Sequence, residues 1–221
     1  MGRFFSMDSK FFTVMSRVAD LVMLNLIFLL CCIPIVTIGA SVTALNYVTL
    51  KMARNEESYI IKGFFKSFKE NFKQSTIIWL IVLITGVILV IDFIITNNMS
   101  DDSLMKIMRY ILYAVSFVYA MTVSYIFPIL AKFENSIKNT FKNAVLMAIR
   151  HLPWTILLVI VTFVPTIITM LIPEVFVYGS LVWFLAGFSL TALINAYIFV
   201  RIFDNYIPQE EIIKDEFTEE V

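Results

Sequence analysis

Residues Glu56 to Gln74, EESYIIKGFFKSFKENFKQ, form the longest water-compatible stretch in a chain that is otherwise strongly apolar. At about 100° per residue, the apolar side chains of this stretch fall within one arc of a helix, and the lysines lie on the flank beside it. The arc holds Ile61, Phe64, Phe65, Phe68 and Phe72, and the flank holds Lys62, Lys66, Lys69 and Lys73. The pattern predicts an amphipathic helix that lies along a membrane surface or against a partner.

The composition places the rest of the chain in a lipid bilayer. Of 221 residues, 60% are hydrophobic and 15% are charged, and the mean hydropathy is +0.87, whereas soluble proteins are about 45 to 50% apolar and about 25% charged. Several apolar runs are about 20 residues long, which is enough to cross about 30 Å of hydrocarbon as a helix. The sequence therefore predicts an all-α, polytopic membrane protein. Its net charge of zero gives no indication of nucleic-acid binding.

The apolar runs pair into three hairpins with polar, basic segments before and between them. The hairpins cover residues 18–53, 76–131 and 152–201, and the amphipathic segments cover residues 3–17, 56–74 and 132–151. We expect one transmembrane domain over residues 1–207, with about six membrane-embedded segments: five full spans plus a short or re-entrant one. The short segment is residues 38–53, and the sequence leaves open whether it crosses fully. An acidic cytoplasmic tail over residues 208–221 completes the prediction.

Basic residues give the orientation, because lysine and arginine collect on the cytoplasmic side of a bacterial plasma membrane. With both termini inside, fifteen of the seventeen basic residues lie inside. The exceptions are Lys106 and Arg109, near a helix end where long side chains can reach the interface. The loop NNMSDDS at 97–103 and a turn at 173–179 carry no lysine or arginine, so we expect both outside.

The order of these segments repeats at an offset of 77 residues, which separates Glu57 from Glu134 and Phe64 from Phe141. Each of these amphipathic segments leads into an outward span. Repeats with the same direction would be related by an axis along the membrane normal, as in some transporters. A bundle of similar hairpins without common ancestry explains the pattern equally well.

The sequence contains no recognisable motif for catalysis, cofactor binding or metal binding. The single histidine, His151, has no second histidine with which to form a metal site, so we interpret it as a helix-start residue at the membrane interface. Cys31 and Cys32 are adjacent within an apolar run, where packing or lipid contact is expected. We therefore expect no enzymatic activity, no cofactor and no metal.

Four polar residues lie within or near the predicted spans, namely Asp20, Asn46, Asp92 and Asn195. An ionisable group in hydrocarbon is a functional hypothesis by default, but Asp20 and Asp92 both lie close to a membrane boundary. Asn46 and Asn195 lie deeper in their helices. There, hydrogen bonding between helices is the usual role, and contact with a substrate is the alternative.

The cytoplasmic amphipathic segments remain as candidate binding surfaces. Permeases of binding-protein-dependent ABC importers seat their ATPase on a helical loop with a Glu, two Ala and a Gly six residues after the Glu, and Glu57 and Gly63 have that spacing. Ser58 and Tyr59 stand in place of the alanines, and a lipid headgroup belt is the simpler interpretation of the lysines. The candidate partner-contacting residues are Glu57, Gly63, Phe64, Phe68, Glu134 and Phe141.

Two stretches carry a resemblance to a known family. PIVTIGAS at 34–41 and ALNYVTLKMARNEESYIIKGFFKSFKENFKQSTIIWL at 44–80 resemble the YesL-like family of small Gram-positive membrane proteins of unassigned biochemistry. The likeness covers roughly residues 3 to 205. It implies an association with carbohydrate ABC importers and their glycoside-degrading neighbours, and it implies no catalytic residue.

The function that we expect is a non-enzymatic accessory or regulatory subunit of an oligosaccharide ABC importer. Such a subunit would contact the permease or the ATPase through its cytoplasmic amphipathic helices. The alternatives are a small-solute transporter in its own right and a membrane sensor. Its surroundings would be the lipid bilayer, no nucleic-acid partner is expected, and homo-oligomerisation is left open because the sequence has no GxxxG motif to indicate it.

Overall fold

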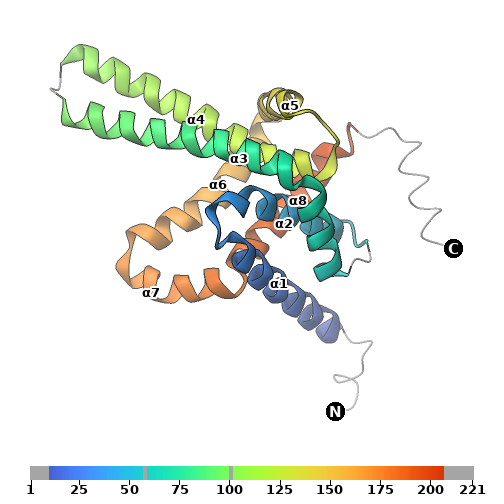
Figure 1. Cartoon of the computed structure of the whole chain (residues 1–221). Helices are drawn as coiled ribbons and strands as arrows, with labels where there is room; N and C mark the ends of the chain where they lie inside the picture. The colour runs from blue at the N-terminus through green and yellow to red at the C-terminus, as the bar shows by residue number, and fades with distance from the viewer. Residues whose placement is uncertain (1–9, 57–58, 100–101, 207–221) are drawn as a thin grey trace.

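The computed structural model describes residues 10–56, 59–99 and 102–206, and these residues form helices joined by short connections (Figure 1). The elements are α1 (Lys10–Cys32), a 3-10 turn η1 (Ile35–Thr37), α2 (Ile38–Ala53), α3 (Ile60–Asn98), α4 (Ser103–Lys132), α5 (Ile137–Arg150), α6 (Leu152–Leu171), α7 (Pro173–Val182), a π-helical turn η2 (Trp183–Gly187) and α8 (Phe188–Phe203). Among the described residues, six segments are long and apolar enough to cross a membrane. The predicted all-α fold with about six membrane-embedded segments is confirmed.

Helix α2 lies at the centre of the bundle, between α1, α3, α4 and α8. Ten of its sixteen residues are buried, and they include small and hydroxyl-bearing side chains. The hydroxyls of Ser41, Thr43 and Thr49 each donate to the backbone oxygen four residues earlier, at distances of 2.9 to 3.0 Å. Because these groups are satisfied within their own helix, they can be buried in an apolar interior.

Helices α2 and α3 pack antiparallel at very short range. A Cβ atom added to Gly39 would lie 2.4 Å from the backbone oxygen of Ser75, so only a glycine permits this approach. Two hydrogen bonds join α3 to α2 and to the 3-10 turn before it. The hydroxyls of Thr43 and Ser75 are 3.1 Å apart, and the indole nitrogen of Trp79 donates to the backbone oxygen of Ile35 at 2.8 Å.

The turn between α1 and α2 is apolar on its outside. Ile33, Ile35 and Val36 are all exposed there, which suits contact with lipid better than contact with water. Figure 1 places this turn near the middle of the molecule, whereas the α3–α4 and α6–α7 turns lie at its left-hand side. The arrangement accords with a hairpin that enters and returns, and the short or re-entrant character of residues 38–53 stays a prediction.

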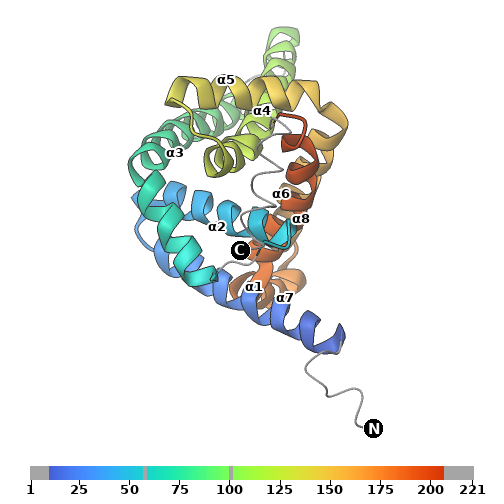
Figure 2. The same ribbon diagram turned by 90° about the vertical axis from the view of Figure 1, so that its right-hand side faces the viewer.

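Two of the predicted surface helices do not form separate elements where the structure describes them, and residues 3–9 of the first one lie outside the described residues. Helix α1 runs without a break through residue 17, and α3 runs for 39 residues through the expected boundary after Gln74. Residues 60–98 contain no proline, so nothing interrupts the backbone hydrogen bonds. At 1.5 Å per residue, α3 is about 58 Å long, roughly twice the hydrocarbon thickness. Its first half therefore extends beyond a single span, and Figure 2 shows it curving around the bundle.

The third predicted amphipathic segment does form its own helix, α5. The backbone leaves helical geometry at His151, and α6 carries Pro153 in its first turn. Proline lacks an amide hydrogen, so it separates α5 from α6, whereas Thr76 at the corresponding position allows α3 to continue. Helices α3 and α5 begin at Ile60 and Ile137, which are 77 residues apart. Their shared offset accords with the predicted repeat.

The predicted outer turn at 173–179 is also replaced by helix. Pro173 occupies the first position of α7, where its fixed φ suits a helix start. From there α7, the π-helical turn and α8 form one continuous segment, Pro173–Phe203. The direction of the chain reverses within two residues of Leu171 rather than over a longer loop.

Two apolar clusters hold the helices together. The larger one contains Tyr125, Phe199 and Phe203 from α4 and α8, with the rings of Tyr125 and Phe199 edge to face at 5.1 Å. The smaller one joins α1, α2 and the first half of α3 through Leu24, Val48 and other buried side chains. In Figure 2, α5 is seen side-on, lying across the bundle above α2.

Candidate functional site

One end of the bundle gathers positive charge, and we call it the basic end. Helices α2, α4, α5 and α8 each finish with a basic residue in the last turn, namely Lys51, Lys132, Arg150 and Arg201. Such residues interact favourably with the negative end of a helix dipole. Arg54 and Asp204 form a salt bridge that ties the end of α2 to the end of α8.

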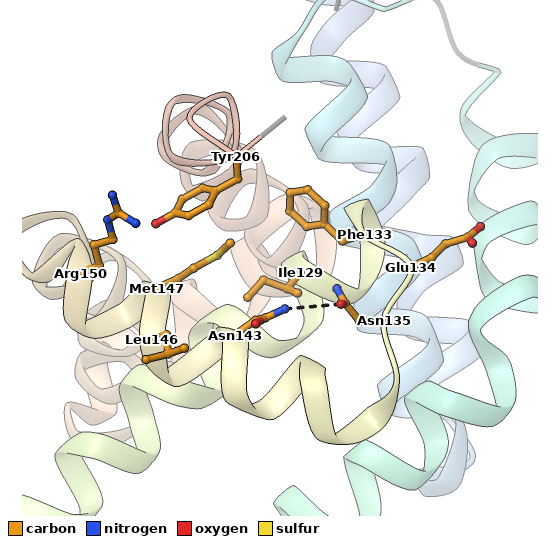
Figure 3. Close-up of a pocket in the computed structure, with 9 residues that line it drawn as sticks. All are labelled: Ile129, Phe133, Glu134, Asn135, Asn143, Leu146, Met147, Arg150 and Tyr206. Atoms are coloured by element: carbon orange, nitrogen blue, oxygen red, sulfur yellow. Dashed lines mark hydrogen bonds between the residues drawn. The ribbon is translucent and has the colours of Figure 1, made fainter. Parts of the chain in front are cut away.

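A groove of about 410 Å³ opens at the basic end beside α5 (Figure 3). We call it the α5 groove. Its lining residues are Ile129, Phe133, Glu134, Asn135, Asn143, Leu146, Met147, Arg150 and Tyr206. The apolar members form the wall against the bundle, where Ile129 and Met147 are buried. Glu134, Asn135, Asn143 and Arg150 supply a polar rim.

Short-range interactions fix the shape of this groove. Ser136 caps α5 by accepting a hydrogen bond from the amide of Asn139. The side chain of Gln74 in α3 donates to the backbone oxygen of Asn135 at 2.6 Å. Asn143 reaches back from α5 and donates to the side-chain oxygen of Asn135 at 3.4 Å. The connection from α4 to α5 is thereby tied both to α3 and to α5.

The other side of the groove is closed by Tyr206. Its hydroxyl lies 3.0 Å from the imidazole Nε2 of His151, and the guanidinium of Arg150 lies over its ring at 5.6 Å. His151 therefore joins the start of α6 to the end of the described chain. Among the described residues, no group of three or more His, Cys, Asp or Glu side chains could hold a metal ion.

The outer face of α5 is exposed and mixed in character. Lys138 and Lys142 are exposed, and Leu146 and Ile149 on the same helix are 54% and 55% exposed. Leu146 borders the α5 groove, whereas Ile149 does not. Apolar side chains beside lysines are typical of a helix that meets a lipid surface or another protein.

The predicted partner-contacting residues differ in how far the structure exposes them. The prediction for Phe64 is wrong, because this side chain is fully buried in the cluster with α2. Gly63 faces Val48 of α2 and Phe68 packs on the same cluster. Phe141 packs against the larger cluster, Glu57 lies outside the described residues, and Glu134 is exposed at the α5 groove. Of these residues, Glu134 is the one that the fold presents at an open site.

The predicted membrane-embedded polar residues fall in three places. Asp20 lies beside Arg17, Asn55 and Glu56 in a pocket at the α2–α3 connection. Asp92 is exposed on the part of α3 that pairs with α4. Asn46 and Asn195, by contrast, meet at one cavity in the middle of the bundle. The two carboxylates are therefore not part of a common pathway with that cavity.

This central cavity measures about 300 Å³. Its lining residues are Phe28, Val42, Leu45, Asn46, Trp79, Val123, Ser124, Phe127, Pro128, Thr162, Phe163, Thr166, Trp183, Phe188, Thr191, Ala192, Asn195 and Phe199. All six candidate membrane segments contribute to it. The amide nitrogen of Asn195 donates to the hydroxyl of Thr162 in α6 at 2.8 Å, which is an interhelical hydrogen bond of the predicted kind.

Sequence reasoning missed Asn25, a fully buried residue in α1. Its amide nitrogen donates to the backbone oxygens of Trp183 and Phe184 at 3.0 and 2.7 Å. Its side-chain oxygen accepts from the amide of Ser189 at 3.1 Å. The available signal was the presence of an asparagine within the apolar run of residues 18–36. Its hydrogen-bond partners lie more than 150 positions later in the sequence and could not be predicted.

Six apolar segments around a buried, hydroxyl-rich central helix define a multi-pass α-helical membrane protein. The chain is similar to the YesL-like family. Residues 21–93 match a family described as "Protein of unknown function, DUF624". The chain is also 24% identical over 151 residues to "Uncharacterized protein YesL" of Bacillus subtilis (strain 168), which covers 68% of this chain and 70% of that protein. No solved structure matches the chain.

Proposed function

We propose that the chain is a non-enzymatic accessory or regulatory subunit of an oligosaccharide ABC importer in the bacterial plasma membrane, with the basic end and both termini in the cytoplasm. The orientation is supported by the basic residues that end α2, α4, α5 and α8. The importer setting is supported by the family resemblance of residues 34–80. The partner at the basic end is a permease loop or an ATPase surface.

The α5 groove is the observation that carries this proposal. An apolar wall with a polar rim is the arrangement by which proteins receive a helix or loop of a partner. The exposed Leu146 at its edge provides an apolar anchor, and Glu134 and Arg150 provide charges of both signs.

Replacing Leu146 with glutamate is expected to reduce recovery of the importer about tenfold or more, since an exposed apolar anchor that a partner buries contributes about 2 kcal/mol to binding. The measurement is a pull-down of the tagged chain from native membranes, with importer permease and ATPase quantified by mass spectrometry. Ile149→Glu is the matched control, because Ile149 has the same exposure on the same helix but lies outside the groove.

The Ile149→Glu variant should recover the importer within about twofold of the native chain, because rim and off-site residues contribute little to binding. If both variants lost importer recovery to the same extent, α5 would serve lipid contact alone. Failure of the native chain to recover any importer subunit would refute the accessory role.

The orientation has its own test by cysteine labelling. In a chain with Cys31 and Cys32 replaced by alanine, Ser103→Cys should react with a membrane-impermeant maleimide in intact cells, and Lys142→Cys should react only after permeabilisation. Both positions are exposed, and they lie at opposite ends of the predicted topology. The reverse labelling pattern would overturn the cytoplasmic placement of α5.

A further inference from the structure

The central cavity lies far from either end of the helices that form it. Thr162 is the eleventh of twenty residues in α6, Asn195 the eighth of sixteen in α8, and Asn46 the ninth of sixteen in α2. In such a position, polar groups have no bulk water and must find partners within the protein or in a bound molecule. Polar side chains at this depth are therefore informative about what the cavity holds.

Asn195 has one hydrogen-bonding group without a partner. The residue is 9% exposed, and its nitrogen is occupied by Thr162, but its buried side-chain oxygen Oδ1 accepts no hydrogen bond. A buried acceptor left unpaired costs free energy. The oxygen itself has almost no accessible surface, so a hydrogen-bond donor in the cavity would remove that cost once the side chain of Asn195 turns its oxygen toward it.

We propose that the central cavity binds a small, uncharged, hydroxyl-bearing ring compound, such as a monosaccharide, with Asn195 Oδ1 accepting a hydrogen bond from one of its hydroxyl groups. This inference is independent of the docking role of the α5 groove, because it concerns the isolated chain. It assigns Asn195 to ligand contact in addition to its bond to Thr162, in a cavity that Asn46 also lines.

The lining determines the chemical class of the ligand. The lining residues that the structure describes carry no ionisable side chain, so a charged ligand would lose its hydration without gaining a counter-ion. A hydrocarbon chain would leave the asparagine oxygen unpaired. Amide and hydroxyl groups combined with aromatic rings suit a molecule with hydroxyls at its edge and an apolar face. A volume of about 300 Å³ restricts the ligand to a small one.

The two tryptophans of the cavity are held in fixed positions. The indole nitrogen of Trp79 donates to the backbone oxygen of Ile35, and that of Trp183 donates to the hydroxyl of Thr169 at 3.0 Å. Neither partner belongs to the cavity lining. The rings are thus preorganised walls, which lowers the entropic cost of binding a ligand between them.

The test uses the purified chain in lipid nanodiscs and its tryptophan fluorescence, since two of its three tryptophans line the cavity. The probes are D-glucose, D-galactose, D-mannose and D-xylose, each paired with its L-enantiomer. We expect a saturable fluorescence change with at least one D-sugar and no such change with its enantiomer, because a pair of enantiomers has identical effects on the solvent. Absence of a saturable change with every D-sugar, or equal changes with both enantiomers, would overturn the proposal.

The variant Asn195→Leu keeps a similar side-chain size and removes the acceptor, so it should weaken binding about tenfold. Asn98→Leu is the control, because Asn98 is exposed and its side chain donates to the backbone oxygen of Ile94 in its own helix. Equal affinity in the two variants would refute the role of Asn195.

A second measurement does not depend on Asn195. In the chain without Cys31 and Cys32, Ser124→Cys places a thiol in the cavity lining. The bound D-sugar should slow the reaction of this thiol with neutral methyl methanethiosulfonate, and its enantiomer should not. Equal reaction rates with and without the sugar would contradict binding in this cavity.

Discussion

Replacement of Asn25 by leucine is expected to lower the free energy of unfolding by about 2 to 3 kcal/mol. The side chain is fully buried and makes three hydrogen bonds to backbone groups of the segment around the π-helical turn. Each hydrogen bond between membrane helices contributes roughly 0.6 to 1.5 kcal/mol. Leucine makes none of them and leaves backbone groups of Trp183, Phe184 and Ser189 without these side-chain partners.

The π-helical turn explains why these bonds matter beyond their number. A π turn displaces the regular pattern of backbone hydrogen bonds, so its carbonyl groups need other donors. Asn25 supplies two such bonds from a different helix. The hydroxyl of Ser189 adds another bond between the two segments, since it donates to the backbone oxygen of Leu21 in α1 at 2.8 Å. Helix α1 is therefore attached to the π turn by polar contacts rather than by apolar packing alone.

The measurement for Asn25→Leu is unfolding in mixed detergent micelles, followed by circular dichroism, with the native chain in parallel. Asn98→Leu is the control, because its bond lies within α3 and the residue is exposed, and it should change stability by less than about 0.5 kcal/mol. An Asn25→Leu variant as stable as the control would show that the π turn does not depend on this side chain.

The direction in which the amphipathic helix of α3 buries its side chains could not be predicted from the sequence. Its arc of Ile61, Phe64, Phe65, Phe68 and Phe72 was visible, but the structure buries Phe64 and leaves Ile61, Phe65 and Phe72 exposed. Lipid and protein interior are equally apolar, so hydrophobic periodicity in a membrane protein does not distinguish the packed face from the lipid face. The small residues of α2 decide which side of α3 packs.

The number and placement of the apolar segments were predictable, because length and hydropathy are properties of each segment alone. The break at Pro153 between α5 and α6 was also encoded locally. The central cavity was not, because Asn46 and Asn195 meet only through the packing of α2 and α8. The α5 groove likewise depends on Gln74 in α3 and on Tyr206 in the turn after α8, both of which are distant from α5 in the sequence.

Replacement of Gly39 by alanine is expected to cost about 2 kcal/mol or more of stability. The added Cβ would lie 2.4 Å from the backbone oxygen of Ser75 and 2.5 Å from the Cβ of Trp79. Neither atom is the end of a flexible side chain, so α2 and α3 must move apart. Overpacking of this kind costs about 1 to 3 kcal/mol. Separation also lengthens the Thr43–Ser75 contact and the bond from Trp79 to Ile35.

A second glycine provides the matched comparison. At Gly63 an added Cβ would meet Val48 at 3.7 Å, which is an ordinary van der Waals contact. Because alanine is favoured over glycine within a helix by about 0.5 to 1 kcal/mol, Gly63→Ala should stabilise the chain. The same substitution at two positions on the same helix pair should thus change stability in opposite directions.

Unfolding of the two variants in the same detergent measures this difference directly, and tryptophan fluorescence gives an independent readout for Gly39→Ala. Trp79 should lose its bond to Ile35 and shift its emission, whereas Gly63→Ala should leave the emission unchanged. If both variants were stabilised to the same extent, α2 and α3 would not be in close contact at Gly39. The central position of α2 would then be wrong, and with it the cavity that α2 helps to enclose.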